Sequence, residues 1–453
     1  MVQNRASPLS LRANFTWTFF GNVIYSGCQW AMLIAVAKLG STTMVGYFAL
    51  GLAVTAPVLM LTNLQLRGLQ ATDTNRQYLF GHYFGLRLLT TPLALGIILG
   101  IALASGYGHE ESLVVVAVGL AKSFESISDV LYGLVQQHER MDRIAKSLII
   151  KGILSLVALA AAVYLTHSIL WGTLALAAAW AVILVTYDMR SGAFVLSRTA
   201  QTPDTVFSAP SYWRGLPSSL QPIWDRRRLM RLAWLALPIG IVIMLGSLTL
   251  NTPRYVIEHD LGANQLGIFA AMAYVVVAGT TVINALVQAT GPRLSHYYAA
   301  GDVVACRDLL LKLLGIGAVM GAGGVVIALV AGREILTVLY RPEYATHVDV
   351  FIWLLVAAAL DYLASLLGYG LTMARYLKVQ VPIVLTALAV MALGSVLLIP
   401  AHGLLGAAWA TCSAFAVLLA LNGYAMNHAL RRRARDAHRT RLYAIMAPSG
   451  SRP

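Results

Sequence analysis

Polar side chains recur at helical spacing in two otherwise apolar stretches of the chain. The two sets are Thr18, Asn22, Ser26 and Gln29, and Ser247, Asn251, Arg254 and Glu258. Intervals of three and four residues place each set on one face of a helix. The second set includes a charged pair, Arg254 and Glu258, which favours a hydrated setting over lipid. The two faces are predicted to line a hydrated cavity; hydrogen bonding between helices of a bundle is the alternative.

Arg254 is the most specific of these residues. It lies near the end of an apolar stretch, and Glu258 follows it by four residues. Either it turns inward as an anion contact, or its long side chain reaches the interface with Glu258 as its partner.

Acidic residues inside other apolar stretches are a second candidate set. Lys122, Glu125 and Asp129 share one helical face, and Asp361 lies in a later stretch. Ionised groups are costly in hydrocarbon and usually face a cavity or a partner. Lys122 can neutralise Glu125, whereas Asp129 has no evident cation of its own. Glu125, Asp129 and Asp361 are therefore candidates for proton or cation coupling, or for pairing with basic residues on other helices.

A third set lies where apolar stretches end. Asn63, Arg67 and Arg87 are close in sequence, and Asn284 and Gln288 occupy corresponding places in the second half. Cations grouped at such a mouth would suit an anionic phosphate group. The general preference of cations for the cytoplasmic side of membrane proteins would also place them there.

The elements that carry these residues are predicted to be transmembrane helices. Mean hydropathy is +0.71, and only 11% of the residues are charged, against about 25% in soluble proteins. We predict an all-α membrane protein with twelve spans. They cover residues 15–37, 44–66, 86–105, 112–135, 147–166, 168–188, 233–256, 265–289, 309–331, 350–373, 380–400 and 403–427.

Basic residues predict the orientation of these spans. With a cytoplasmic N-terminus, 28 of the 33 Lys and Arg residues fall on the cytoplasmic side, Lys151 included. The outer side holds Lys38, Arg254, Arg333 and Arg341, and Lys122 lies within a span. Both termini are therefore predicted to be cytoplasmic. The basic segments would meet anionic membrane lipids, and no nucleic-acid partner is predicted.

The chain also repeats itself. "LGSTTMVGYFA" (39–49) matches "LGANQLGIFA" (261–270), and the register places Asn63 opposite Asn284, Arg67 opposite Gln288 and Arg87 opposite Arg307. Six spans separate the partners, so the halves keep one orientation and are related by an axis along the membrane normal. We predict a six-helix lobe (1–188), a mostly irregular cytoplasmic linker (189–232), a second six-helix lobe (233–427) and a basic cytoplasmic tail (428–453).

Catalytic and metal motifs are absent from the sequence. It contains no HExxH, Walker-type or GxSxG pattern, and its three cysteines have no paired spacing. No enzyme activity, metal or cofactor is predicted.

Three stretches resemble a known family. They are "NLQLRGLQATDTNRQYLFGHYFGLRLLTT", "PRYVIEHDLGANQLGIFAAMAYVVVAGTTVINALVQATGPRLSHYYAAGD" and "LYRPEYATHVDVFIWLLVAAALDYLASLLGYGLTMARY". The chain resembles the polysaccharide transport (oligosaccharide flippase) family of the multidrug/oligosaccharidyl-lipid/polysaccharide (MOP) exporter superfamily. The resemblance implies two six-helix lobes in a V around a central cavity, working by alternating access.

The resemblance also implies a substrate and a location. Members of this branch carry a lipid-linked oligosaccharide, usually on undecaprenyl diphosphate, from the cytoplasmic to the outer leaflet of the bacterial cytoplasmic membrane. A glycan polymerase and glycosyltransferases of the same pathway are implied partners. The sugar contacts would be Asn22, Gln29, Asn63, Asn251, Asn284 and Gln288, and the diphosphate contacts Arg254 with Arg67 or Arg87.

Two alternatives stay open. A cation-coupled small-molecule exporter could use the same lobes, although drug-exporting relatives often carry an acid in span one, where this chain has Asn22. A membrane glycan polymerase or ligase would be expected to have a sizeable outer loop, and here the longest loop is predicted to be cytoplasmic.

Overall fold

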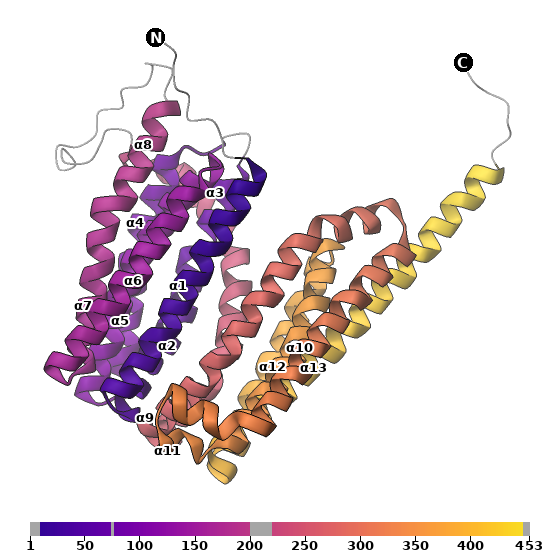
Figure 1. Cartoon of the computed structure of the whole chain (residues 1–453). Helices are drawn as coiled ribbons and strands as arrows, with labels where there is room; N and C mark the ends of the chain where they lie inside the picture. The colour runs from indigo at the N-terminus through magenta and orange to yellow at the C-terminus, as the bar shows by residue number, and fades with distance from the viewer. Residues whose placement is uncertain (1–9, 74–76, 200–219, 447–453) are drawn as a thin grey trace. The chain divides into compact units, whose positions relative to one another are not determined.

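The computed structural model describes residues 10–73, 77–199 and 220–446, and these residues form helices and no strand (Figure 1). The first half contains α1 (Leu11–Leu39), α2 (Thr42–Asn63), α3 (Leu66–Thr72), α4 (Phe80–Ala104), α5 (His109–Gln137), α6 (Met141–Thr166), α7 (Ile169–Ile183), the π-helix η1 (Leu184–Asp188) and α8 (Met189–Thr199). The second half contains α9 (Arg226–Ala300), α10 (Val303–Leu339), α11 (Pro342–Ala345), α12 (Val348–Met373) and α13 (Leu377–Met446).

The predicted all-α membrane fold is confirmed. Within the described ranges, nine helices are long and apolar enough to cross a membrane. Two of these helices, α9 and α13, are each interrupted by a glycine with positive φ. The glycines are Gly262 in α9 (φ 82°) and Gly403 in α13 (φ 59°). The charged helix α5 is a further element of 29 residues. Counted with these breaks, the helices correspond to the twelve predicted spans, and the chain is a multi-pass membrane protein.

The linker predicted at 189–232 begins later than expected. The helix of span six continues through η1 and α8 to Thr199, and α9 starts at Arg226. Packing explains the continuation, because Val195 is buried against α5 and the Arg143 guanidinium lies 3.8 Å from the centre of the Phe194 ring. Residues 200–219 of the predicted linker lie outside the described part of the chain.

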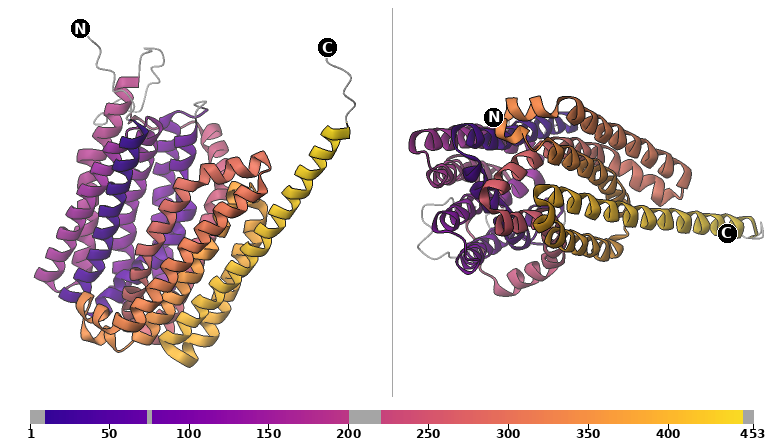
Figure 2. Two further views of the ribbon diagram at one scale, coloured as in Figure 1. Left: turned by 45° about the vertical axis from the view of Figure 1, so that its right-hand side comes forward. Right: turned by 90° about the horizontal axis from the view of Figure 1, so that it is seen from below.

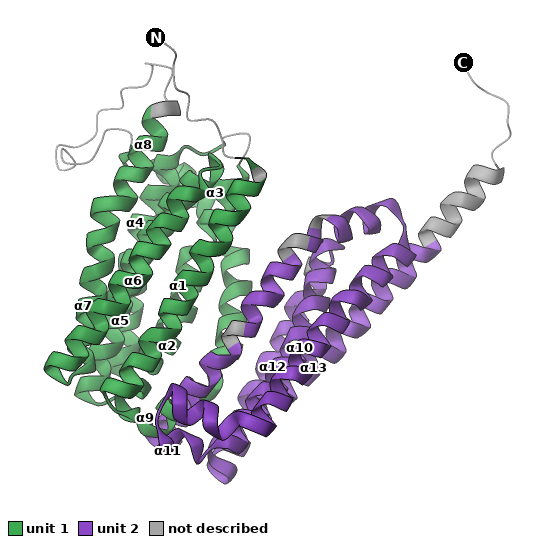
Figure 3. Ribbon diagram, viewed as in Figure 1, with its two compact units in different colours: residues 1–254, 263–268 green, residues 255–262, 269–453 purple. Residues whose placement is uncertain are grey.

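The chain forms two compact units (Figure 3). Unit 1 contains residues 1–254 and 263–268, and unit 2 contains residues 255–262 and 269–453. In unit 1 the helices run side by side, as both views of Figure 2 show. The division into lobes at 189–232 remains a prediction.

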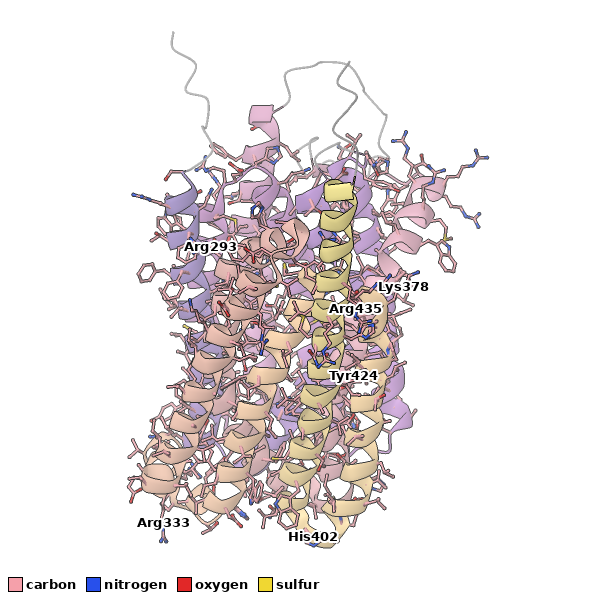
Figure 4. The ribbon with its side chains drawn as sticks, turned by 90° about the vertical axis from the view of Figure 1, so that its right-hand side faces the viewer. Arg293, Arg333, Lys378, His402, Tyr424 and Arg435 are labelled. Carbon is pink, nitrogen blue, oxygen red and sulfur yellow. The ribbon has the colours of Figure 1, made fainter. Side chains whose placement is uncertain are left out.

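Four basic residues of unit 2 lie toward opposite ends of its helices. Here α12 packs against α10 and α13. Figure 4 shows Arg293 and Lys378 toward one end of these helices and Arg333 and His402 toward the other. The sequence assigns Arg293 and Lys378 to the cytoplasmic side and Arg333 to the outer side, so this arrangement agrees with the predicted alternation of the spans.

Small residues bring α1 and α6 close together in unit 1. A Cβ atom at Gly21 would lie 2.7 Å from Cα of Ala145, and one at Gly152 would lie 3.1 Å from Cβ of Cys28. Helices in hydrocarbon associate through such close backbone packing, because burial of apolar surface from water is no longer available as a driving force.

An enclosed ion pair joins α5, α6 and η1. Lys151 Nζ lies 3.3 Å from Asp188 Oδ2, and both side chains are 1% exposed. The ammonium also donates to Ser128 Oγ (2.9 Å) and Tyr132 Oη (3.1 Å), while Ser128 and Ser147 donate to the carboxylate. Lys151, counted above with the cytoplasmic residues, is therefore a buried residue of α6 whose charge is neutralised within the bundle.

Removing one member of this pair should destabilise the protein strongly. Lys151→Met leaves the Asp188 carboxylate buried and uncompensated, and the free energy of unfolding should fall by about 3–5 kcal/mol. In Lys151→Met/Asp188→Asn, a neutral amide still accepts from the serines, and much of the stability should return. Unfolding in detergent measures both variants, and a double variant no more stable than the single one would contradict the role of the charge.

Candidate functional site

The first candidate site lies where α2 ends. Leu64 and Gln65 both adopt positive φ (52° and 50°), so the chain turns sharply between α2 and α3. This turn places Asn63 and Arg67 beside α5. We call Asn63, Arg67, Arg87, Asp129 and Gln136 the arginine cluster.

Arg87 is the enclosed member of the arginine cluster. Its side chain is 0% exposed, and its Nη2 lies 3.6 Å from Asp129 Oδ2. Nη2 also donates to the backbone carbonyl of Asn63 (3.1 Å), and Nη1 donates to Asn63 Oδ1. Because Asn63 is the last residue of α2, the guanidinium satisfies a carbonyl at the negative end of that helix. Arg87 thus holds α2 and α5 together.

Arg67 is the accessible member. Its Nε donates to Gln136 Oε1 (3.0 Å), its Nη1 lies 3.5 Å from Asp129 Oδ1, and its side chain remains 33% exposed. The guanidinium also lies 5.6 Å from the centre of the Tyr132 ring. These contacts orient the side chain while leaving part of it open to a ligand.

The structure brings Asp129 together with Asn63, Arg67 and Arg87, which the sequence had grouped as a separate set. Asp129 has no evident cation on its own helix, and it pairs with two arginines of other helices, which is one of the two alternatives that the sequence left open. Two guanidinium groups and one carboxylate leave the arginine cluster with one excess positive charge.

Glu125 is neutralised as expected. Lys122 Nζ donates to its Oε2 (2.7 Å), and the Tyr25 hydroxyl donates to its Oε1 (2.6 Å), which ties α1 to α5. The Lys122 ammonium also lies 4.9 Å from the Trp180 ring centre. On α1, Gln29 follows Tyr25 by one turn and is half-buried, while Asn22 is exposed and donates to the Thr18 carbonyl (2.8 Å).

The polar face of α9 forms a hydrogen-bonded series. Asn251 Nδ2 donates to the Ser247 carbonyl (2.8 Å), and Arg254 Nη1 donates to Asn251 Oδ1 (2.9 Å). Glu258 is half-buried one turn later, and the helix continues to the break at Gly262. The polar set predicted on one face of this helix is therefore continuous. Its role in binding remains a prediction.

Unit 2 repeats this arrangement only partly. Asp361 accepts a hydrogen bond from Ser365 (3.3 Å), and no described Lys, Arg or His forms an ion pair with it. Asn284 accepts a long hydrogen bond from Tyr369 (3.5 Å). Arg307, opposite Arg87 in the repeat, is exposed, and the side chain of Gln288 lies outside the described residues.

The sequence reading missed two members of this region, Tyr132 and Gln136. Both extend the face of α5 that carries Glu125 and Asp129, at further steps of three and four residues. The signal was present in the spacing. Both residues are uncharged and lie beyond Asp129, the last charged residue of that face.

Comparison with known proteins gives one clear relative by sequence. The chain is 26% identical over 407 residues to the capsular polysaccharide biosynthesis protein CapF of Staphylococcus aureus, covering 90% of this chain and 97% of that protein. No family model matches the chain.

Solved structures identify the fold. An inward-facing multidrug resistance MATE family transporter of the MOP superfamily matches with a TM-score of 0.65 and 12% identity, over 96% of this chain and all of the other. The lipid II flippase MurJ in an inward closed conformation matches with a TM-score of 0.66 and 9% identity, over 97% and 94%. The chain has the MOP superfamily fold. The resemblance inferred from the sequence is thereby confirmed, together with a homologue in polysaccharide biosynthesis.

The repeat supplies a control for the structural role of Arg87. Arg87→Met removes a buried guanidinium that pairs with Asp129 and donates hydrogen bonds to Asn63 at the end of α2. The free energy of unfolding should fall by roughly 2–3 kcal/mol, less than for a fully buried pair because Asp129 is partly exposed. Arg307→Met changes an exposed arginine at the corresponding place and should cost less than about 0.5 kcal/mol. Equal losses in detergent unfolding would contradict the assignment.

Proposed function

We propose that the chain is a flippase for a lipid-linked oligosaccharide. It would carry the substrate, on undecaprenyl diphosphate, from the cytoplasmic to the outer leaflet of the bacterial cytoplasmic membrane. Support comes from the MOP fold, from the relative in capsular polysaccharide biosynthesis and, above all, from the arginine cluster. Both termini would be cytoplasmic. Glycosyltransferases would act on the substrate before the flippase, and a polymerase would act after it.

The arginine cluster would receive the diphosphate. Its excess positive charge favours an anion, and Arg67 is the member with exposed surface. Guanidinium groups bind phosphate oxygens through paired, charge-assisted hydrogen bonds. Gln136 and Asp129 hold Arg67 in place, so little side-chain freedom is lost on binding. Arg87 is enclosed in this state and would act by positioning Asn63 and Asp129.

The polar helical faces would contact the sugars. Asn22 and Gln29 on α1, and Asn251, Arg254 and Glu258 on α9, offer donors and acceptors of the kind that hydroxyl groups need. Asn284 and Gln288 would complete the set in the second half of the chain. Several such contacts, each modest, can select a headgroup without any bond being broken, so no enzymatic step is required.

Asp361 is the acid best suited to energy coupling. Glu125 and Asp129 each have a basic partner, whereas the described residues offer Asp361 a single hydroxyl. An acid without a counter-ion inside a membrane protein is a site where a proton or metal cation can reduce the cost of charge. We propose that Asp361 binds the coupling ion.

Two other functions fit less well. The fold alone would also suit a cation-coupled exporter of small molecules, but the face of α1 offers Asn22 and no acid. A glycan polymerase or ligase would need reactive groups in a water-exposed loop on the outer side. The arginine cluster favours the flippase, because a diphosphate-linked substrate requires an anion site.

Arg67 provides the test of the diphosphate site. Arg67→Ala should reduce export of the glycan about 10- to 100-fold, as expected for loss of a hydrogen bond to a charged group. Lipid-linked repeat units should accumulate in the inner leaflet, where their amounts can be measured by mass spectrometry. Arg307→Ala serves as the matched control. Normal export by a stably folded Arg67→Ala protein would exclude this role.

Asp361 provides the test of coupling. Asp361→Asn cannot bind a proton or attract a cation, so transport into vesicles should fall to the level seen without an ion gradient, while substrate binding persists. Asp361→Glu should keep part of the gradient dependence. Full gradient-driven transport by the asparagine variant would rule Asp361 out as the coupling residue.

A further inference from the structure

The helix α13 continues well beyond the span that the sequence predicts for it. That span ends at residue 427, yet α13 remains helical to Met446. On either side of the predicted end, Met426 and Leu430 are buried in an apolar cluster that also contains Leu294 of α9. The basic segment at the end of the chain therefore begins as part of a packed helix of unit 2.

Arg433 fixes this part of α13 to the end of α9. Its Nε donates to the carbonyl of Tyr298 (2.9 Å), its Nη2 donates to the carbonyl of Ala299, and its guanidinium carbon lies 5.8 Å from the centre of the Tyr298 ring. Both carbonyls lie in the last turn of α9, at the negative end of the helix. Because one rigid guanidinium binds two carbonyls, it defines the rotation of α13 about its axis as well as its position.

The side of α13 opposite Arg433 is exposed and basic. Four exposed residues follow one another at intervals of four, three and four, which places them on one side of the helix. We call them the cationic face: Tyr424, His428, Arg431 and Arg435. Two residues correspond to slightly more than half a helical turn, so Arg433 points away from both Arg431 and Arg435.

This side of α13 changes from apolar to basic along the helix. Ala416 and Ala420, eight and four residues before Tyr424, are exposed and carry only methyl groups, and Tyr424 itself is 76% exposed. Figure 4 shows Arg435 nearer than Tyr424 to the end of the helices at which Lys378 lies, the end predicted to be cytoplasmic. The helix thus offers a flat apolar surface, then an interfacial tyrosine, then guanidinium groups at the level of lipid headgroups.

We propose that the cationic face is a binding site for an anionic glycerophospholipid of the inner leaflet. The phosphate lies between Arg431 and Arg435, and one acyl chain lies along the alanines that precede Tyr424. Arg433 holds the face in the orientation that the lipid requires. Composition predicts only that a basic segment meets anionic lipid, whereas the latched helix makes a site of fixed geometry. The inference does not depend on what the chain transports.

A phospholipid fits this face better than other anions do. Guanidinium groups bind phosphate oxygens through paired, charge-assisted hydrogen bonds. A soluble phosphate compound would make no use of the apolar surface that continues from Tyr424 toward the alanines. A lipid-linked oligosaccharide is also anionic, but the four members of the cationic face include no amide or acid for its sugars.

The test compares two double variants of the full-length protein in a neutral detergent. Arg431→Gln/Arg435→Gln removes two charges from the cationic face. Arg226→Gln/Arg227→Gln is the matched control, because it removes two exposed charges at the start of α9. Native mass spectrometry counts the phosphatidylglycerol molecules that each protein retains as this lipid is added.

The cationic-face variant should bind its tightest phosphatidylglycerol about 10- to 30-fold more weakly than the wild-type protein, and the control variant should bind it as the wild-type protein does. Equal weakening in both variants would mean that net charge alone attracts the lipid, and it would overturn the site. Unchanged binding in the cationic-face variant would overturn it as well.

Arg433 allows a second test at constant charge. Arg433→Lys keeps the positive charge, but an ammonium group cannot reproduce the rigid fork that reaches two carbonyls, so lipid binding should weaken several-fold. Arg432→Lys changes an exposed arginine outside the cationic face and should have no effect. Unchanged binding in Arg433→Lys would overturn a site of fixed geometry.

A competition experiment separates the phospholipid from the lipid that the chain is proposed to transport. Undecaprenyl diphosphate, added in an amount equal to phosphatidylglycerol, should leave the phosphatidylglycerol on the wild-type protein. Displacement would overturn the proposal and assign the cationic face to the transported lipid. None of these measurements involves transport, so a failure of the flippase function would leave their outcome unchanged.

Discussion

An ionised side chain among apolar helices is costly unless it is paired, and unit 1 is organised around this constraint. Lys151 with Asp188, and Lys122 with Glu125, form neutral pairs between or along helices. The Lys151–Asp188 pair leaves little room for a different packing of α6 against η1, because separating the partners would expose a charge to hydrocarbon. The pair on α5 is tied to α1 by the hydrogen bond from Tyr25 to Glu125. These pairs therefore give the bundle a defined arrangement against which the less balanced groups can be placed.

The arginine cluster is the exception to this balance, and the proposed anion site rests on its excess charge. Arg87 and Asp129 neutralise each other, so the excess charge belongs to Arg67, which is also the partly exposed member. A protein that only needed to join α2 to α5 would require Arg87 alone. A second arginine that is held in place yet still accessible is what the proposed anionic ligand would need. The enclosed arginine supports the structure, and the accessible one keeps exposed surface.

The sequence predicted the helices well, because long apolar runs depend only on composition along the chain. It also grouped Asn63, Arg67 and Arg87 at one mouth and noted Asp129 separately. It could not predict that Asp129 joins the other three, since the contact depends on the sharp turn at Leu64 and Gln65, where two non-glycine residues adopt positive φ. The pairing of Lys151 was missed for a related reason: its partner Asp188 is 37 positions away, and only packing brings the two together. Gln136 lies one helical step beyond Tyr132 on the polar face of α5, so spacing alone predicts its place there.

The repeat explains why some equivalent positions diverge and others do not. Arg87 is enclosed while its counterpart Arg307 is exposed, because each contacts only its own surroundings and the two halves could change separately. Gly46 and Gly267 have no such freedom. A Cβ atom at Gly46 would overlap the carbonyl oxygen of Ala263, and one at Gly267 that of Thr42, so a side chain at either position would disrupt the contact. Identity between the repeats is therefore required where these equivalent glycines meet, and asymmetry is permitted elsewhere. The arginine cluster of the first half can then exist beside a contact that both repeats share.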